Sequence, residues 1–347
     1  MIIVSGLLFL VSCTLDDDSN INGNKDCPAG KTFSDGVYVL NEGNFGSGNG
    51  GISWISGSLQ LDDAFNCANG YVAGDVVQSL TVQGNIGYLV VNNSQKIEIV
   101  DMNTMVSSGR IFGLRSPRYM LQTGEDKAYV TDLYDDSLAM LSISQRRVLK
   151  KIPASGWTNK MVRVNGKVYV TQRRSQNDTR PGGNNILVID PNFDRVTDSI
   201  GVGKGITEIV ADASGSIWVL TEHGPFSASP SVVRINTNTK ALTSVNPIID
   251  SLEARALVTD SSANLVYYIN GGVYRIKTTQ PNPAPELIIQ RKGRRFYGLG
   301  ISPKGEILVS DAKDYTVNGT VLRYTPEGVL KDTFQAGIIP NSFIFRK

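Results

Sequence analysis

The stretch GVYVLNE at residues 36–42 decides the fold, because similar stretches recur along the chain. Each places an aromatic residue, or once a leucine, in a strand-like run that ends in turn-forming residues. The other copies are GYLVVNN (87–93), KAYVTDL (127–133), KVYVTQR (167–173), SIWVLTE (216–222), LVYYING (265–271) and EILVSDA (306–312). Counted between Tyr38, Tyr88, Tyr129, Tyr169, Trp218, Tyr267 and Leu308, the intervals are 50, 41, 40, 49, 49 and 41 residues. Such a period is typical of propeller blades, so the sequence predicts seven.

Each repeat divides into four short strands. In the third repeat these are PRYMLQ (117–122), KAYVTD (127–132), LAMLSIS (138–144) and VLKKIPA (148–154). Asp, Asn, Gly and Pro occupy the breaks between strands, as turns require, and no helical spacing exceeds two turns. We therefore expect an all-β, seven-bladed β-propeller with four-stranded blades over residues 36–347. An irregular β-sandwich or a pair of domains is the alternative, but neither usually keeps so regular an interval.

The C-terminal stretch IPNSFIFRK (339–347) resembles the first strand of a blade, yet no second strand follows it. The first copy, GVYVL (36–40), has no strand before it. We expect the two ends to pair in one sheet, which closes the ring and removes its exposed edges.

The N-terminus reads as an export signal. The apolar run MIIVSGLLFLVSC (1–13) is about half the ~20 residues that a membrane-spanning helix needs, and its end resembles the lipobox of bacterial lipoproteins. We expect a signal peptide at 1–12, lipidation of Cys13 and a flexible tether at 13–35. The acidic triplet at 16–18 is similar to the signal that takes Bacteroides-type lipoproteins to the outer face of the outer membrane; a plain solvated linker would look the same.

Net charge excludes one class of partner. The chain has 34 basic and 32 acidic residues, a net charge of +2, and no polybasic block. Nucleic-acid binding therefore has no electrostatic support, and we expect membrane contact only through the N-terminal lipid.

Long connections concentrate on one face. In a four-stranded blade, the loops between the second and third strands share a face with the connections between blades. These loops are long in NEGNFGSGNGG (41–51), QRRSQNDTRPGGNN (172–185), TEHGPFSASPS (221–231) and DAKDYTVNGT (311–320). The glycines of the first loop precede a strand-like stretch, so neither a dinucleotide fingerprint nor a P-loop fits. Long loops in compact domains are commonly functional, so we expect this face to bind a ligand.

The stretches VYVLNEGNFGSGNGGISW (37–54), GDVVQSL (74–80) and GYLVVNNSQKIEIVD (87–101) resemble the YncE-like seven-bladed propeller lipoproteins of Bacteroides-type bacteria, a group that includes the cobalamin-binding BtuG lipoproteins. The resemblance covers roughly residues 36–347. It implies a surface lipoprotein that binds a corrinoid (cobalamin, vitamin B12) and passes it to an outer-membrane TonB-dependent transporter. The motif Asn-Glu-Gly-Asn at 41–44 is fairly specific for the family but says little about the ligand.

The candidate face combines aromatic rings with amide and charged groups, a mixture that suits a large amphipathic ligand such as a corrinoid. An oligosaccharide or a protein partner would suit it too, so a glycan-binding lipoprotein or an interaction scaffold remains the alternative. The candidate residues are Asn41, Glu42, Asn44, Phe45, Asn92, Arg115, Arg118, Tyr134, Asp135, Trp157, Asn159, Arg173, Glu222, His223, Phe296, Tyr297 and Asn341.

Catalysis has little support in the sequence. The chain has a single histidine, His223, which excludes a multi-histidine zinc site and leaves few ways to activate a nucleophile. We expect neither enzymatic activity nor a resident cofactor. An oxygen-ligand calcium site remains an open option, with candidate ligands Asp132, Asp135, Glu222 and Asp311.

An exported protein meets oxidising conditions, so the two cysteines other than Cys13, Cys27 and Cys67, are expected to pair. The alternative is two buried free thiols. If Cys27 and Cys67 form a disulfide, thiol titration of the unfolded, unreduced protein should detect neither of them. Two reactive thiols in that measurement would reject the disulfide.

Overall fold

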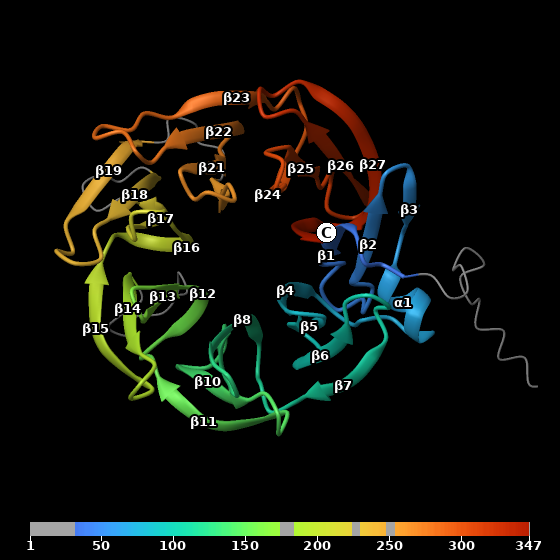
Figure 1. The fold of residues 1–347 in the computed structure, drawn as a ribbon, viewed down its shortest axis with the longest axis horizontal. Coiled ribbons are helices and arrows are strands. Elements are labelled where there is room, and N and C mark those ends of the chain that lie inside the picture. The colour runs from blue at the N-terminus through green and yellow to red at the C-terminus, as the bar shows by residue number, and fades with distance from the viewer. Residues whose placement is uncertain (1–31, 174–183, 224–229, 248–253, 347) are drawn as a thin grey trace, which may run out of the picture.

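The computed structural model describes residues 32–173, 184–223, 230–247 and 254–346. Seven antiparallel four-stranded sheets are arranged as blades around a central axis (Figure 1). The prediction of an all-β, seven-bladed propeller with four-stranded blades is confirmed. Within the described ranges, no helix has the length and apolar character needed to cross a membrane.

From the axis outward, each blade contains the following strands. Blade one has β28 (Pro340–Arg346), β1 (Gly36–Asn41), β2 (Gly51–Ser56) and β3 (Leu59–Leu61); blade two has β4 (Val77–Gln83), β5 (Ile86–Val91), β6 (Lys96–Asp101) and β7 (Ser107–Ile111). Blade three has β8 (Pro117–Gly124), β9 (Lys127–Asp132), β10 (Ser137–Ser142) and β11 (Arg147–Pro153); blade four has β12 (Trp157–Val164), β13 (Lys167–Arg173), β14 (Asn185–Asp190) and β15 (Arg195–Gly201). Blade five has β16 (Lys204–Ala211), β17 (Ile217–His223), β18 (Ser231–Ile235) and β19 (Leu242–Pro247); blade six has β20 (Arg255–Thr259), β21 (Leu265–Ile269), β22 (Gly272–Lys277) and β23 (Glu286–Gln290). Blade seven has β24 (Phe296–Ile301), β25 (Ile307–Asp311), β26 (Asn318–Tyr324) and β27 (Leu330–Ile338).

The repeated aromatic residue lies in the second strand of its blade, and none of the seven equivalent side chains is more than 4% exposed. The rings supply apolar area between sheets, while their polar atoms fix turns. The Tyr38 hydroxyl of blade one donates to the carbonyl of Met102 in blade two at 2.7 Å. The indole of Trp218 donates to the Asp212 carboxylate at 2.8 Å. The repeat that predicts the fold is therefore also the packing unit between blades.

The hydrophobic core is divided into seven clusters, one between each pair of neighbouring blades. Between blades one and two, for example, Leu40 and Trp54 pack with Leu80 and Leu89. Each sheet buries both of its faces against its two neighbours. The outer-facing sides of the first and last sheets are buried only if these two blades also pack against each other.

That closure is made by the two chain ends, as expected. Strand β28 pairs antiparallel with β1, with Val39 opposite Phe343 and Gly36 opposite Arg346. The same strands build the seventh cluster, in which Val39 and Phe343 pack against Leu308 and Val321 of blade seven.

Two local features differ from the sequence expectation. A short helix, α1 (Ala64–Asn69), follows β3; the Asp63 side chain caps it by accepting from the backbone N–H groups of Phe65 and Asn66. In addition, the predicted tether extends too far. Phe33 is buried, its ring meets Trp54 at 5.4 Å, and its backbone N–H donates to the carbonyl of Asn103. The packed domain therefore begins before Gly36.

The expected signal peptide (1–12), Cys13 and Cys27 lie outside the described residues. Cys67 is disulfide-bonded. Its pairing with Cys27 stays a prediction, to be checked by the thiol titration.

If β28 closes the ring, removing its contacts should destabilise the protein. Phe343→Ala should lower the free energy of unfolding by about 3–5 kcal/mol, because a buried phenyl ring is lost from the seventh cluster. Deleting residues 340–347 should cost more, since it also exposes the edge of β1. Chemical and thermal denaturation measure both effects.

Phe193→Ala is the matched control, because Phe193 is 63% exposed on a turn of blade four. It should change stability little. Equal unfolding midpoints for the wild type and the deletion variant would contradict ring closure.

Candidate functional site

The innermost strand of every blade is irregular near its first residues. In all seven blades its pairing with the second strand shifts register there. In blade three, for example, Pro117 faces Asp132 and Met120 faces Val130, so Arg118 and Tyr119 together oppose one residue. Such β-bulges leave a residue unpaired and re-aim its side chain. Here they bring side chains from different blades toward the axis.

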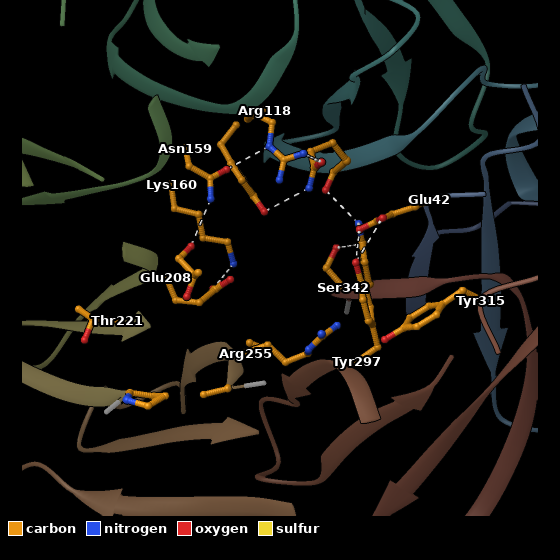
Figure 2. Close-up of a pocket in the computed structure, with 17 residues that line it drawn as sticks. Glu42, Arg118, Asn159, Lys160, Glu208, Thr221, Arg255, Tyr297, Tyr315 and Ser342 are labelled. Carbon is orange, nitrogen blue, oxygen red and sulfur yellow. Dashed lines mark hydrogen bonds and ion pairs between the residues drawn. The ribbon is translucent and has the colours of Figure 1, made fainter. Parts of the chain in front are cut away.

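A cavity of about 620 Å³ lies between the seven innermost strands (Figure 2). This volume is within the usual range for small-molecule sites. The second-to-third-strand loops of blades one and seven contribute Glu42 and Tyr315, so the cavity belongs to the face with the long connections. The lining residues are Glu42, Gln78, Arg118, Tyr119, Asn159, Lys160, Thr207, Glu208, Thr221, Pro230, Ala254, Arg255, Ala256, Tyr297, Tyr315, Asn341 and Ser342.

One wall of the cavity is built around Glu42. Its carboxylate accepts hydrogen bonds from the side-chain amide of Asn341 at 3.0 Å and from the hydroxyl of Tyr297 at 3.2 Å. The Tyr297 ring meets Tyr315 edge-on at 5.7 Å, and the guanidinium of Arg255 lies 4.6 Å from the centre of the Tyr297 ring. The chain ends meet here, because Glu42 follows β1 and Asn341 belongs to β28.

The next part of the lining carries Arg118 and Asn159 (Figure 2), and Gln78 lies beside Arg118. The Arg118 guanidinium donates from Nε to Asn159 Oδ1 at 3.0 Å and from Nη1 to Gln78 Oε1. Beside them, Lys160 pairs with Glu208 and lies 5.2 Å from the centre of the Tyr119 ring. These contacts link blades two to five around the cavity.

The cavity shifts the titration of several groups. Burial raises the pKa of Glu42, although Asn341 and the nearby Arg118 favour its charged form. Burial alone would lower the pKa of Lys160, but the Glu208 carboxylate outweighs it, so the pKa is raised. Burial and the Glu42 carboxylate raise the pKa of the Tyr297 hydroxyl. At neutral pH Lys160 is therefore a cation, and Tyr297 is a neutral hydrogen-bond donor.

The described lining residues include three cations, Arg118, Lys160 and Arg255, and two carboxylates, Glu42 and Glu208. Amides and hydroxyls supply further donors and acceptors. Such a lining can orient a polar ligand through many hydrogen bonds.

Five of the predicted site residues line the cavity. They are Glu42, Arg118, Asn159, Tyr297 and Asn341. Whether they contact a ligand stays a prediction.

A second group lies on the loops of the same face but does not line the cavity. Asn44 donates from its side chain to the carbonyl of Tyr315 at 2.7 Å. Phe45 is 73% exposed beside it. Tyr134 meets Trp157 edge-on at 5.3 Å, and Arg115 is exposed. These residues form an aromatic and polar rim.

Four predicted residues need correction, because the fold itself uses their side chains. Asn41 is buried and donates to Ser53 Oγ at 2.9 Å. Asn92 is buried and ties blade two to the carbonyl of Pro117 at 2.8 Å. Asp135 binds Lys151 and Ser137, and Phe296 belongs to the cluster between blades six and seven.

The side chains of Arg173, Glu222 and His223 lie outside what the structure describes, so their predicted roles are not placed.

The proposed calcium ligands that can be placed do not gather. Asp132 ends β9 in blade three, whereas Asp311 ends β25 in blade seven. Asp132 accepts from the backbone of Ser116 and Asp311 from that of Lys313, as turn-capping carboxylates do. Across residues 32–346, apart from the three undescribed internal segments, no group of three His, Cys, Asp or Glu side chains could hold a metal ion.

Several polar or aromatic lining residues were not predicted: Gln78, Tyr119, Lys160, Thr207, Glu208, Arg255, Tyr315 and Ser342. Several of them occupy equivalent positions in the first strand of their repeats. Gln78, Thr207 and Arg255 lie at or beside the register shift of their innermost strands, as Arg118, Asn159 and Tyr297 do. Extending the seven-fold alignment to the first strand of each blade would have found them.

Solved structures of other proteins share the fold. A Quinonprotein alcohol dehydrogenase-like protein from Bacteroides thetaiotaomicron has 15% sequence identity and a TM-score of 0.70, covering 92% of this chain and 80% of that one. A putative 6-phosphogluconolactonase from Bacteroides fragilis has 12% identity and a TM-score of 0.65, covering 90% and 98%. A functionally unknown protein from Desulfotomaculum acetoxidans has 13% identity and a TM-score of 0.64, covering 90% and 99%. At such identities the similarity shows the fold alone.

No curated protein matches the sequence. The family model described as "Domain of unknown function (DUF5074)" matches residues 35–326, from the entry of β1 to the turn after β26. Since this match spans most of the seven blades and most of the cavity lining, the chain belongs to the DUF5074 family.

Proposed function

We propose that this protein is a surface lipoprotein that captures a polar organic nutrient at its central cavity without transforming it. The observation that carries the proposal is the cavity itself, to which all seven innermost strands contribute and which combines amides, charges and aromatic rings. A mixed lining of this kind suits binding through many weak, oriented contacts.

A corrinoid is the first candidate ligand, on the resemblance to YncE-like propeller lipoproteins. Its flat macrocycle carries peripheral amides, which match the side-chain amides of Gln78, Asn159 and Asn341. The exposed rings at the rim, Phe45 and Tyr134, would supply apolar contact for the part of the macrocycle outside the cavity. In this proposal a TonB-dependent transporter receives the ligand, and Cys13 anchors the protein to the outer membrane.

The lining favours binding over catalysis. Its carboxylates are each engaged: Glu42 by Asn341 and Tyr297, and Glu208 by Lys160. Among the described lining residues there is no serine or cysteine beside a histidine, which nucleophilic catalysis commonly uses. We therefore propose a non-enzymatic role.

Glycan binding is the second candidate. The pair of Tyr134 and Trp157 presents aromatic surface at the rim, and Tyr134 is 49% exposed. Sugar faces stack on such rings. A pure protein–protein scaffold would use the same rings as anchors but leave the cavity empty.

Binding of cyanocobalamin tests the first candidate. Titration calorimetry should show binding to the wild type, and Tyr297→Ala should weaken it by about tenfold or more, because aromatic side chains at binding sites often contribute ~2 kcal/mol. Trp157→Ala should weaken it less, since Trp157 lies at the rim. Phe193→Ala, a ring removed from another part of the surface, serves as the control.

Absence of cyanocobalamin binding to a correctly folded wild type would reject the corrinoid. Retention on an oligosaccharide array, lost on Trp157→Ala, would favour the glycan instead.

Lipid anchoring has its own test. Cys13→Ser should move the protein from the detergent phase to the aqueous phase in detergent partition of cell extracts, because the acylated residue is lost. If the variant partitions like the wild type, the lipobox interpretation is wrong.

A further inference from the structure

Among the described residues, one cation of the cavity has no carboxylate within ion-pair distance. Lys160 pairs with Glu208, and Arg255 stacks on the ring of Tyr297. For Arg118, by contrast, no carboxylate of the described chain comes within the 4.0 Å of an ion pair. Within the part of the chain that the structure describes, its positive charge therefore has no carboxylate in direct contact.

The Arg118 guanidinium is nevertheless held in place. Asn159 of blade four accepts from Nε, and Gln78 of blade two accepts from Nη1. A guanidinium has five N–H donors, of which these two contacts use two. Three donors, including both on Nη2, have no acceptor among the described residues. Neutral amides on both sides thus fix the orientation of the guanidinium without neutralising it.

Further donors lie on the same side of the cavity. Tyr119, next to Arg118 in the bulge, accepts from the amide of Gln78 at 3.3 Å and keeps its own hydroxyl proton for another acceptor. The ammonium of Lys160 lies 5.2 Å from the centre of the Tyr119 ring. Glu42 occupies a different wall, where Asn341 and Tyr297 donate to it (Figure 2). The side of the cavity with Arg118, Lys160 and Glu208 therefore has one more cation than carboxylate among its described residues.

We propose that Arg118 is the anchor for an anionic oxygen group, phosphate or carboxylate, of the ligand held in this cavity. A planar guanidinium with fixed orientation and unused N–H groups matches such groups in geometry as well as charge. The inference rests on the proposed function only in taking the cavity as a ligand site. Two sources of the anion fit: the phosphodiester in the nucleotide loop of a complete corrinoid, or the carboxylate of a small organic acid.

Four probes distinguish these sources by titration calorimetry: cyanocobalamin, which has the phosphodiester; dicyanocobinamide, which lacks it; succinate; and inorganic phosphate. Arg118→Gln should weaken binding of each anionic probe that binds by about tenfold or more, since hydrogen bonds to charged groups are strong. Dicyanocobinamide affinity should not change. Glu42→Gln should strengthen anion binding, because it removes a negative charge from the same cavity.

Two further variants separate binding from folding. Arg195→Gln makes the same charge change on an exposed outer strand and should bind every probe like the wild type. Arg118→Lys keeps the charge but loses the paired donors, so it should restore part of the affinity lost in Arg118→Gln. Circular dichroism melting verifies that each variant is folded.

Binding of succinate or phosphate that depends on Arg118, without any binding of cyanocobalamin, would support the anion site and reject the corrinoid. Equal anion affinity in folded Arg118→Gln and wild type would overturn the site, even where cyanocobalamin binds. A wild type that binds none of the three anionic probes at millimolar concentration would overturn it as well.

Discussion

The antiparallel pairing of β28 with β1 is the constraint on which the rest of the molecule depends. It joins residues 340–346 to residues 36–41 and closes the ring. The core is divided into seven clusters between neighbouring sheets, so an open ring would leave two sheet faces and a strand edge in water. Bringing the ends of a long chain together costs loop-closure entropy, which grows only slowly with length. Burial in the seventh cluster offsets it.

The same architecture creates the cavity. Around the axis, the innermost strands diverge from regular pairing at equivalent points, and the bulges turn polar side chains inward. Backbone geometry is thus repeated seven times, whereas the side chains differ from blade to blade. A nearly symmetric scaffold therefore carries an asymmetric lining, with Glu42 on one wall and Arg118 on another. Asymmetry of this kind is what allows a site on the axis to orient a ligand.

Much of the fold follows from the sequence, because its information is local and repeated. Tyr38 and its equivalents mark the second strand of each blade, and the unpartnered strand at 339–347 predicts closure. The helix α1 was not predicted, since it is shorter than two turns and its start depends on one capping carboxylate, Asp63. The burial of Phe33 was missed as well, because its partners, the Trp54 ring and the Asn103 carbonyl, are distant in the sequence and meet it only when blades one and two pack.

The site was predicted less completely, for a physical reason. Loop length and residue type pointed to rim residues such as Phe45 as ligand contacts. They could not show which polar side chains are already hydrogen-bonded within the fold. Asn41 and Asn92 look like ligand contacts in the sequence and instead bond within and between blades. Conversely, Lys160 and Glu208 belong to the first strands of their blades, where charged residues read as ordinary solvent-facing positions. Only the register shifts reveal that they face the axis.

The meeting of the chain ends has a consequence for how the protein is made. Glu42 and Asn341 are 299 residues apart in the chain, so Glu42 is synthesised well before Asn341 and Ser342, and all three line the cavity. A chain that has not reached β28 therefore lacks the Asn341 amide that donates to Glu42 and the strand that closes the ring. The cavity is therefore complete only once β28 has been synthesised, and a chain cut before Pro340 would leave it open beside Glu42.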